Sequence, residues 1–174
     1  LTKKGSAGQA LRILKGVTAD AVPAAPLYQA FREMALWNYD ATVRLLPKYI
    51  LDNPASYQSL VARVNLASAL VWLEIPDEAA PLLEQLIAEA NKSGALRLKA
   101  NALELRAQLH LQTSEYALCR ADLHEARASL DSPTRDQLFV RKWQAVLSAR
   151  EHGSLDPLHK FSDEAVHRQH WESV

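Results

Sequence analysis

The feature of the sequence that most constrains its fold is a helical pattern that occurs twice, 40 positions apart. In each copy, four apolar or small residues lie at positions 0, 4, 7 and 11, which places them on one stripe of a helix. The first copy is Ala79, Leu83, Leu86 and Ala90, and the second is Cys119, Leu123, Ala126 and Leu130. A small residue, Ala67 or Ala107, precedes each copy at the same offset. The repeated unit is therefore a pair of helices that cross at small side chains, which predicts a helical repeat protein.

Composition supports helices throughout. The chain has only five glycines, and Ala, Leu, Glu, Gln, Arg and Lys dominate its long segments. Because no segment resembles a strand, we predict an all-α fold, a tetratricopeptide-like superhelical stack of antiparallel helix pairs. Its 174 residues suffice for one domain, so we expect residues 1–174 to form a single helical-repeat domain. The chain begins with Leu1 rather than Met, and we expect it to be a piece of a longer protein.

We expect a right-handed stack of about nine helices. It begins with half a repeat, a single helix around Leu11 and Leu14. The later ones are predicted at residues 27–37, 41–51, 57–73, 76–93, 96–111, 116–130, 133–152 and 155–169. Several apolar residues are assigned to stripes that face the core. They include Thr42, Leu46 and Tyr49, then Leu96, Ala100, Leu103 and Ala107, and then Phe139, Trp143 and Val146. The four tryptophans, Trp37, Trp72, Trp143 and Trp171, are interpreted as packing groups.

Charge and hydropathy exclude two classes of partner. Lys plus Arg equals Asp plus Glu, 20 of each, so the basic excess typical of nucleic-acid binding is missing and we expect no nucleic-acid contact by this segment. No run approaches the roughly 18 apolar residues that a membrane span requires, so no membrane partner is expected. A single cysteine, Cys119, cannot form an internal disulfide and indicates an intracellular location, cytoplasm or nucleus.

Polar residues on the first helix of each pair are candidates for a partner-binding groove. Stacked helical hairpins form a concave face from their first helices, and such grooves commonly bind a peptide or a partner helix. The groove candidates are Asn65, Ser68, Trp72, Asn101, Glu104 and Gln108. The competing interpretation is an ordinary solvated helix face, since polar surface residues are common without any role.

Metal binding and catalysis are not expected, and neither is a cofactor. Histidines gather late in the chain, at His152, His159, His167 and His170, but the pair Glu164 and His167 has no second copy to complete a di-metal site. Cys119 lies on a core stripe, where a thiol behaves as a small apolar group. No phosphate-binding loop, nucleophile elbow or Cys-x-x-Cys pair occurs, so the sequence predicts a protein that is not an enzyme.

The repeat residues resemble a known superfamily. Ala67, Ala79, Leu83 and Leu86, together with the Tyr39-Asp40 and Glu115-Tyr116 turns and with Pro54 after a second helix, resemble the tetratricopeptide repeat. The period of about 37 to 40 residues exceeds that family's 34, and most first-helix Trp, Gly and Tyr residues of the family are absent. Members that clamp a peptide carboxylate use Lys and Asn at the positions of Val64 and Ser68, so Val64 argues against that clamp here.

Two more specific resemblances lead to different functions. Asn65-Leu66-Ala67, Ile75-Pro76, Trp143-Gln144-Ala145 and Gly153 resemble the repeats of the fifth subunit of the anaphase-promoting complex, which implies a structural subunit of a cell-cycle ubiquitin ligase. Residues 105–110 and 121–123 resemble the sensor repeats of maltose-activator-type bacterial regulators.

The sequence thus leaves two functions open. The first is a protein-protein interaction scaffold, a subunit or adaptor of a larger assembly that binds a protein or peptide, further repeats of its own chain or a second copy. The alternative is a ligand- or peptide-sensing repeat domain of a multidomain transcriptional regulator.

Overall fold

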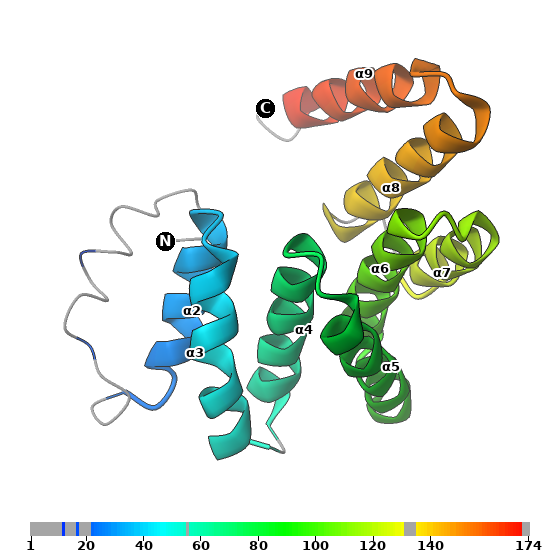
Figure 1. The fold of residues 1–174 in the computed structure, drawn as a ribbon. Helices are drawn as coiled ribbons and strands as arrows, with labels where there is room; N and C mark the ends of the chain where they lie inside the picture. The colour runs from blue at the N-terminus through cyan, green and yellow to red at the C-terminus, as the bar shows by residue number, and fades with distance from the viewer. Residues whose placement is uncertain (1–11, 13–16, 18–21, 55, 131–134, 172–174) are drawn as a thin grey trace. The chain divides into compact units, whose positions relative to one another are not determined.

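The computed structural model describes residue 12, residue 17 and residues 22–54, 56–130 and 135–171, with backbone alone for 135 and 166–171. Within these ranges the chain forms eight α-helices and no strand, which confirms the predicted all-α fold (Figure 1). The helices are α2 (Ala25–Ala35), α3 (Tyr39–Asp52), α4 (Tyr57–Trp72), α5 (Pro76–Ser93), α6 (Leu96–Gln112), α7 (Tyr116–Ala128), α8 (Arg135–His152) and α9 (Asp156–Trp171). The helix predicted around Leu11 and Leu14 lies outside the described residues.

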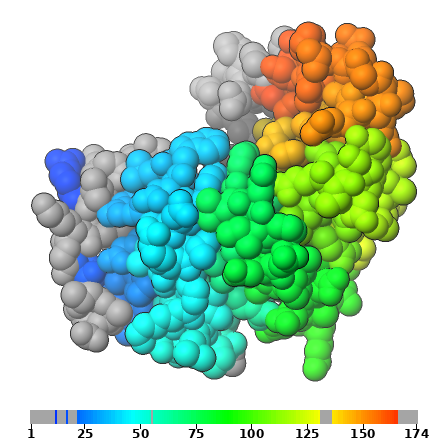
Figure 2. All heavy atoms as spheres, viewed as in Figure 1, coloured from blue at the N-terminus to red at the C-terminus, as the bar shows by residue number. Residues whose placement is uncertain are grey.

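The chain divides into two compact units, Leu1–Leu86 and Ile87–Val174, and the division falls inside α5. In the first unit, α3 packs against both α2 and α4, and α2 also contacts α4. The atoms of α2 and α3, blue to cyan, lie against one another in the space-filling view (Figure 2). In the second unit, α7 packs against α6 and α8, while α8 packs against α6 and α9. Within each unit, contacts thus join helices that are adjacent in the chain, from α2 to α4 and from α6 to α9, and join one first helix to the next, as expected for a helical repeat.

Small side chains occupy equivalent buried positions in successive helix pairs. Ala30, Ala67 and Ala107 in the first helices are 0% exposed. Twelve positions after each of them, the second helix buries Thr42, Ala79 or Cys119. Small residues at these points allow two helix backbones to approach closely, because ridges of large side chains would hold the axes apart. Leucines follow four positions later as Leu46, Leu83 and Leu123, all of them buried. The predicted stripes are confirmed at these positions.

The turns inside the helix pairs are also equivalent. The residue seven positions after each crossing alanine has a left-handed backbone, with φ of 62° at Trp37, 58° at Glu74 and 63° at Ser114. The next amide nitrogen in each turn donates back to a carbonyl of the first helix, for example Glu115 N to His110 O at 2.8 Å. These bonds close Schellman motifs, in which glycine is the usual left-handed residue. Gly94 and Gly153 have the same conformation, which confirms Gly94 as the predicted cap of α5 and places a helix end at Gly153.

Two residues assigned to core stripes are exposed instead. Leu96, at 44% exposure, is the first residue of α6, where the helix has not yet entered its packed layer. Phe139 is also 44% exposed, because α8 buries Val140 and Leu147, whereas the other two residues of the predicted stripe, Trp143 and Val146, are half-buried against the core. The Phe139 ring instead lies 5.7 Å from the Lys142 Nζ.

The left-handed turn gives a stability prediction. Replacing the exposed Ser114 by glycine removes the clash of a Cβ with the backbone, so Ser114→Gly should raise the free energy of unfolding by about 0.5–1 kcal/mol. Ser114→Ala keeps the Cβ and should give no gain. Urea denaturation of both variants checks this prediction, and equal stabilities for the glycine and alanine variants would contradict it.

Candidate functional site

The six predicted groove residues fall into two sets of three, one in each compact unit. Asn65, Ser68 and Trp72 lie on α4, and Asn101, Glu104 and Gln108 lie on α6. Their spacing of three and four positions puts each set on one face of its helix. Asn65 uses its amide on its own helix, donating to Val61 O at 2.7 Å, whereas Gln108 donates to Glu104 Oε1 at 3.0 Å. Only some of these residues belong to side-chain clusters: Trp72 to an aromatic cluster in the first unit, and Glu104 and Gln108 to a polar cluster in the second.

In the first unit, Trp72 forms an exposed aromatic cluster with Trp37 and Tyr39. Tyr39 and Trp72 stack with their rings nearly parallel, 8° apart, and with ring centroids separated by 5.7 Å. Trp37 stands edge-on to both, at 6.3 Å from Tyr39 and 5.9 Å from Trp72. Trp37 is 70% exposed and Trp72 is 46% exposed, so these two tryptophans, interpreted from the sequence as packing groups, lie at the surface. They pack mainly on each other, at the surface.

The backbone around Trp37 holds this cluster in place. Trp37 N donates to Met34 O at 3.1 Å and Asn38 N donates to Glu33 O at 2.9 Å, which fixes the turn on both sides of the indole. The Asn38 side chain caps α3 by accepting from Ala41 N and also donates to the Glu33 carboxylate at 2.8 Å. A bulky residue at positive φ is uncommon and costs of the order of 1–2 kcal/mol. The turn therefore presents a large aromatic side chain where glycine would be more stable.

In the second unit, the predicted groove residues Glu104 and Gln108 lie in a polar cluster with Lys142 and Trp143 of α8. Burial raises the Glu104 pKa to about 7, and the charge of Lys142 and the hydrogen bond from Gln108 oppose that rise only in part. Burial also lowers the pKa of Lys142, whose Nζ lies 4.4 Å from the Trp143 ring centroid. The buried Nε1 of Trp143 lies close enough to the Glu104 carboxyl group to lower its pKa. The contact between them does not have the ordinary geometry of a hydrogen bond. The face of α6 in this unit therefore carries a half-buried carboxyl group, that of Glu104, which titrates near neutral pH.

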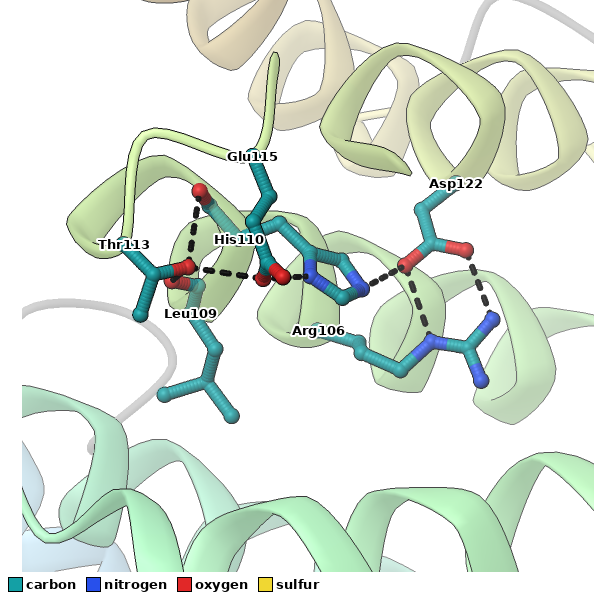
Figure 3. A network of polar contacts seen from close by, with 6 residues as sticks. All are labelled: Arg106, Leu109, His110, Thr113, Glu115 and Asp122. Atoms are coloured by element: carbon teal, nitrogen blue, oxygen red, sulfur yellow. Dashed lines mark hydrogen bonds and ion pairs between the residues drawn. The ribbon is translucent and has the colours of Figure 1, made fainter. Parts of the chain in front are cut away.

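A second polar network joins α6 to α7 (Figure 3). Arg106 donates to both oxygens of the buried Asp122 carboxylate, at 2.8 and 2.7 Å, and His110 Nε2 lies 3.6 Å from the same group. On its other side, His110 Nδ1 is 2.9 Å from Glu115, which also accepts from Thr113 at 2.8 Å. These bonds lower the Glu115 pKa. The network satisfies the one buried carboxylate of α7 and fixes that helix against α6, which is a structural role.

The residues considered for metal binding or nucleophilic chemistry lie elsewhere. Glu164 forms an ion pair with Arg141, and the side chain of His167 lies outside the described residues. Within the described part of the chain, no three His, Cys, Asp or Glu side chains form a group that could hold a metal ion. Burial raises the pKa of Cys119 to about 11, with Asp122 and Glu151 contributing, so its thiol stays protonated at neutral pH. That environment is the apolar one predicted for Cys119.

Comparison with known proteins gives no relative: no family model, no curated protein and no solved structure matches the chain. No helix in the described ranges is both long and apolar enough to cross a membrane. The two clusters therefore have to be interpreted from their own chemistry.

Only part of each cluster was predicted from the sequence: Trp72 in the aromatic cluster, and Glu104 and Gln108 in the polar one. Trp37, Tyr39 and Lys142 were not assigned to a site, because their neighbours come from other helices. One signal was available for Trp37: it occupies the turn position that Glu74 and Ser114 occupy in later pairs, seven residues after the crossing alanine.

The Arg106 network predicts a specific pattern of stability. Arg106→Met leaves the Asp122 carboxylate buried without its bidentate donor, so it should lower the free energy of unfolding by about 2–3 kcal/mol. Adding Asp122→Leu removes the orphaned charge and should restore most of that loss. Urea denaturation of both single variants and the double variant measures the coupling, and strictly additive losses would show that the two side chains act independently.

Glu104 predicts a stability change with pH. Because its folded pKa, about 7, lies above the unfolded value of 4.5, the folded state binds more protons between these values. Stability therefore falls as pH rises through that window, and this loss is complete above pH of about 7. Glu104→Gln should stabilise the protein more at pH about 8 than at pH about 5, measured by urea denaturation. The exposed control variant Glu84→Gln should show no such difference, and a pH-independent effect of Glu104→Gln would contradict the assignment.

Proposed function

We propose that this protein is a non-enzymatic interaction scaffold built from tetratricopeptide-like helix pairs, a subunit or adaptor of a larger assembly. Support for the architecture comes from the equivalent crossing alanines, leucines and left-handed turns in successive pairs. Support for a role in protein-protein interaction comes from the aromatic cluster. The proposed location is intracellular, which rests on the single cysteine.

The observation that carries this proposal is the exposure of Trp37 and Trp72 in an ordered arrangement. Large aromatic side chains are enriched at the centres of protein interfaces, where they contribute much of the binding energy. Most exposed apolar residues need no explanation, because they are scattered singly. Here the rings of Trp37, Tyr39 and Trp72 contact one another and the backbone holds Trp37 at a conformational cost. A preformed aromatic surface loses little entropy on binding.

The class of partner follows from the charge. With a formal net charge of zero, the chain has no overall attraction for the phosphate backbone of nucleic acids. A protein or peptide partner fits an aromatic surface better. A second copy of the chain or further repeats can also occupy such a surface, and the experiment below separates these partners.

The second candidate function is a ligand- or peptide-sensing domain of a regulator. The observation that favours it is Glu104, since a carboxyl group with a strongly raised pKa beside a lysine is typical of functional sites. In this case the face of α6 and α8 that carries Glu104, Gln108 and Lys142 would bind the ligand.

Partner capture tests the scaffold proposal. The full-length protein is tagged in its own cells and purified gently, as the wild type and as the double variant Trp37→Ser/Trp72→Ser. We expect a fixed, stoichiometric set of companions with the wild type and its loss with the double variant. Tyr57→Ser, which removes another exposed aromatic side chain of the first unit, is the matched control and should keep the companions.

Two results would count against this proposal, the first against the binding surface and the second against the scaffold itself. If the double variant kept every companion, the aromatic cluster would not be the binding surface. If the wild type purified alone and Glu104→Gln changed its affinity for a small ligand, the sensor would replace the scaffold.

A further inference from the structure

We infer that the aromatic cluster binds a basic segment of the partner protein, with an arginine side chain placed against its rings. This inference rests on the proposed function and specifies the chemistry of the partner. It depends on two properties of the first unit: the aromatic faces that the cluster exposes and the charge of the chain segments that carry them.

The rings offer the geometry that a guanidinium group prefers. A cation is attracted to the face of an indole, and arginine stacks on aromatic faces more readily than lysine because its guanidinium is planar and weakly hydrated. Trp37 is 70% exposed and meets the other two rings at nearly right angles, 79° and 86°. Much of its indole is therefore open to a planar cation.

The segments that carry these rings are acidic, although the whole chain is neutral. Tyr39 is followed by Asp40, and Trp72 is followed by Glu74, Asp77 and Glu78, all of them exposed. No Lys or Arg occurs in residues 33–43 or in residues 64–86. The nearest basic residues outside these ranges include Arg32, which forms an ion pair with Glu33, and Arg44, which is exposed one turn after Asp40. A cationic segment would therefore meet more carboxylates than cations on the segments that form this surface.

Helix capping explains part of this acidity but not all of it. Asp40, Asp77 and Glu78 lie in first turns, where a carboxylate favours the helix N-terminus. Glu74 does not, because it has a left-handed backbone in the turn between α4 and α5. In either role these side chains stay exposed at the surface, so the acidic character of the segments remains. An acidic or phosphorylated partner would be repelled from the same surface.

The test is calorimetric titration of the 174-residue chain with short synthetic peptides. The probe is a peptide of alternating arginine and serine, and the comparison peptides replace arginine by lysine or by glutamine. We expect the arginine peptide to bind most tightly, the lysine peptide more weakly and the glutamine peptide not at all. Binding should weaken as salt is added, because the attraction is electrostatic in part.

Matched variants separate the aromatic contribution from the charge. Trp37→Ser/Trp72→Ser should weaken arginine-peptide binding about tenfold or more, by loss of the cation-aromatic contacts. Asp40→Asn/Glu74→Gln should also weaken it and reduce its salt dependence. Tyr57→Ser and Glu84→Gln, at exposed positions outside the cluster, should bind like the wild type. Circular dichroism confirms that each variant is folded.

Three results would overturn the inference: no binding of the arginine peptide to the wild type, equal binding of the glutamine peptide, or unchanged binding to the Trp37→Ser/Trp72→Ser variant. These failures are distinguishable from failure of the scaffold. If the captured companions depend on the tryptophans but the arginine peptide does not bind, the scaffold stands and the partner chemistry is wrong. If the peptide binds at the cluster but the companions are unaffected, the proposed scaffold site is wrong.

Discussion

The close approach of helices at small side chains is the constraint on which the rest of the structure depends. Ala30, Ala67 and Ala107 are completely buried, and in a closely packed interior a larger side chain at such a position is destabilising. Because helix crossing points are fixed by such contacts, the residues at a given offset from each alanine reach the same place in successive pairs. Buried leucines occur at one offset and left-handed turns at another. The repeat is thus a property of packing as much as of sequence similarity, which explains how it persists while the usual first-helix aromatic residues are missing.

The features to which we assign a function in our proposals arise where side chains deviate from that regular pattern. The left-handed turn position favours glycine, yet Trp37 occupies it, and the cost of that conformation is offset by the bonds that close the turn. The result is an indole fixed at the surface beside Tyr39 and Trp72. In the second unit, Glu104 lies on a first-helix face where its burial is not fully compensated, which raises its pKa to about 7.

Much of the fold could be predicted from the sequence, because periodicity and turn residues are local signals. The stripe of Leu83 and Leu86, the cap at Gly94 and the start of α5 at Pro76 agree with the structure. The failures have a common cause. Periodicity cannot distinguish a buried stripe from its neighbour one residue away, which is the error at Phe139, and it cannot show that Trp37 and Trp72 meet across two helices. Groove residues were identified by helix face alone, so Glu104 and Gln108 were found while Lys142 was not. The raised pKa of Glu104 depends on burial, which sequence does not encode locally.

The exposed aromatic residues form one ordered surface before any partner binds. Solution NMR of the free chain can test this order, through nuclear Overhauser contacts among the rings of Trp37, Tyr39 and Trp72 and through the coupling constants that report φ at Trp37. We expect cross-peaks between the Trp37 indole and both other rings, together with a positive φ at Trp37. A Trp37 indole with contacts only to its own backbone, and couplings averaged over several conformations, would contradict it.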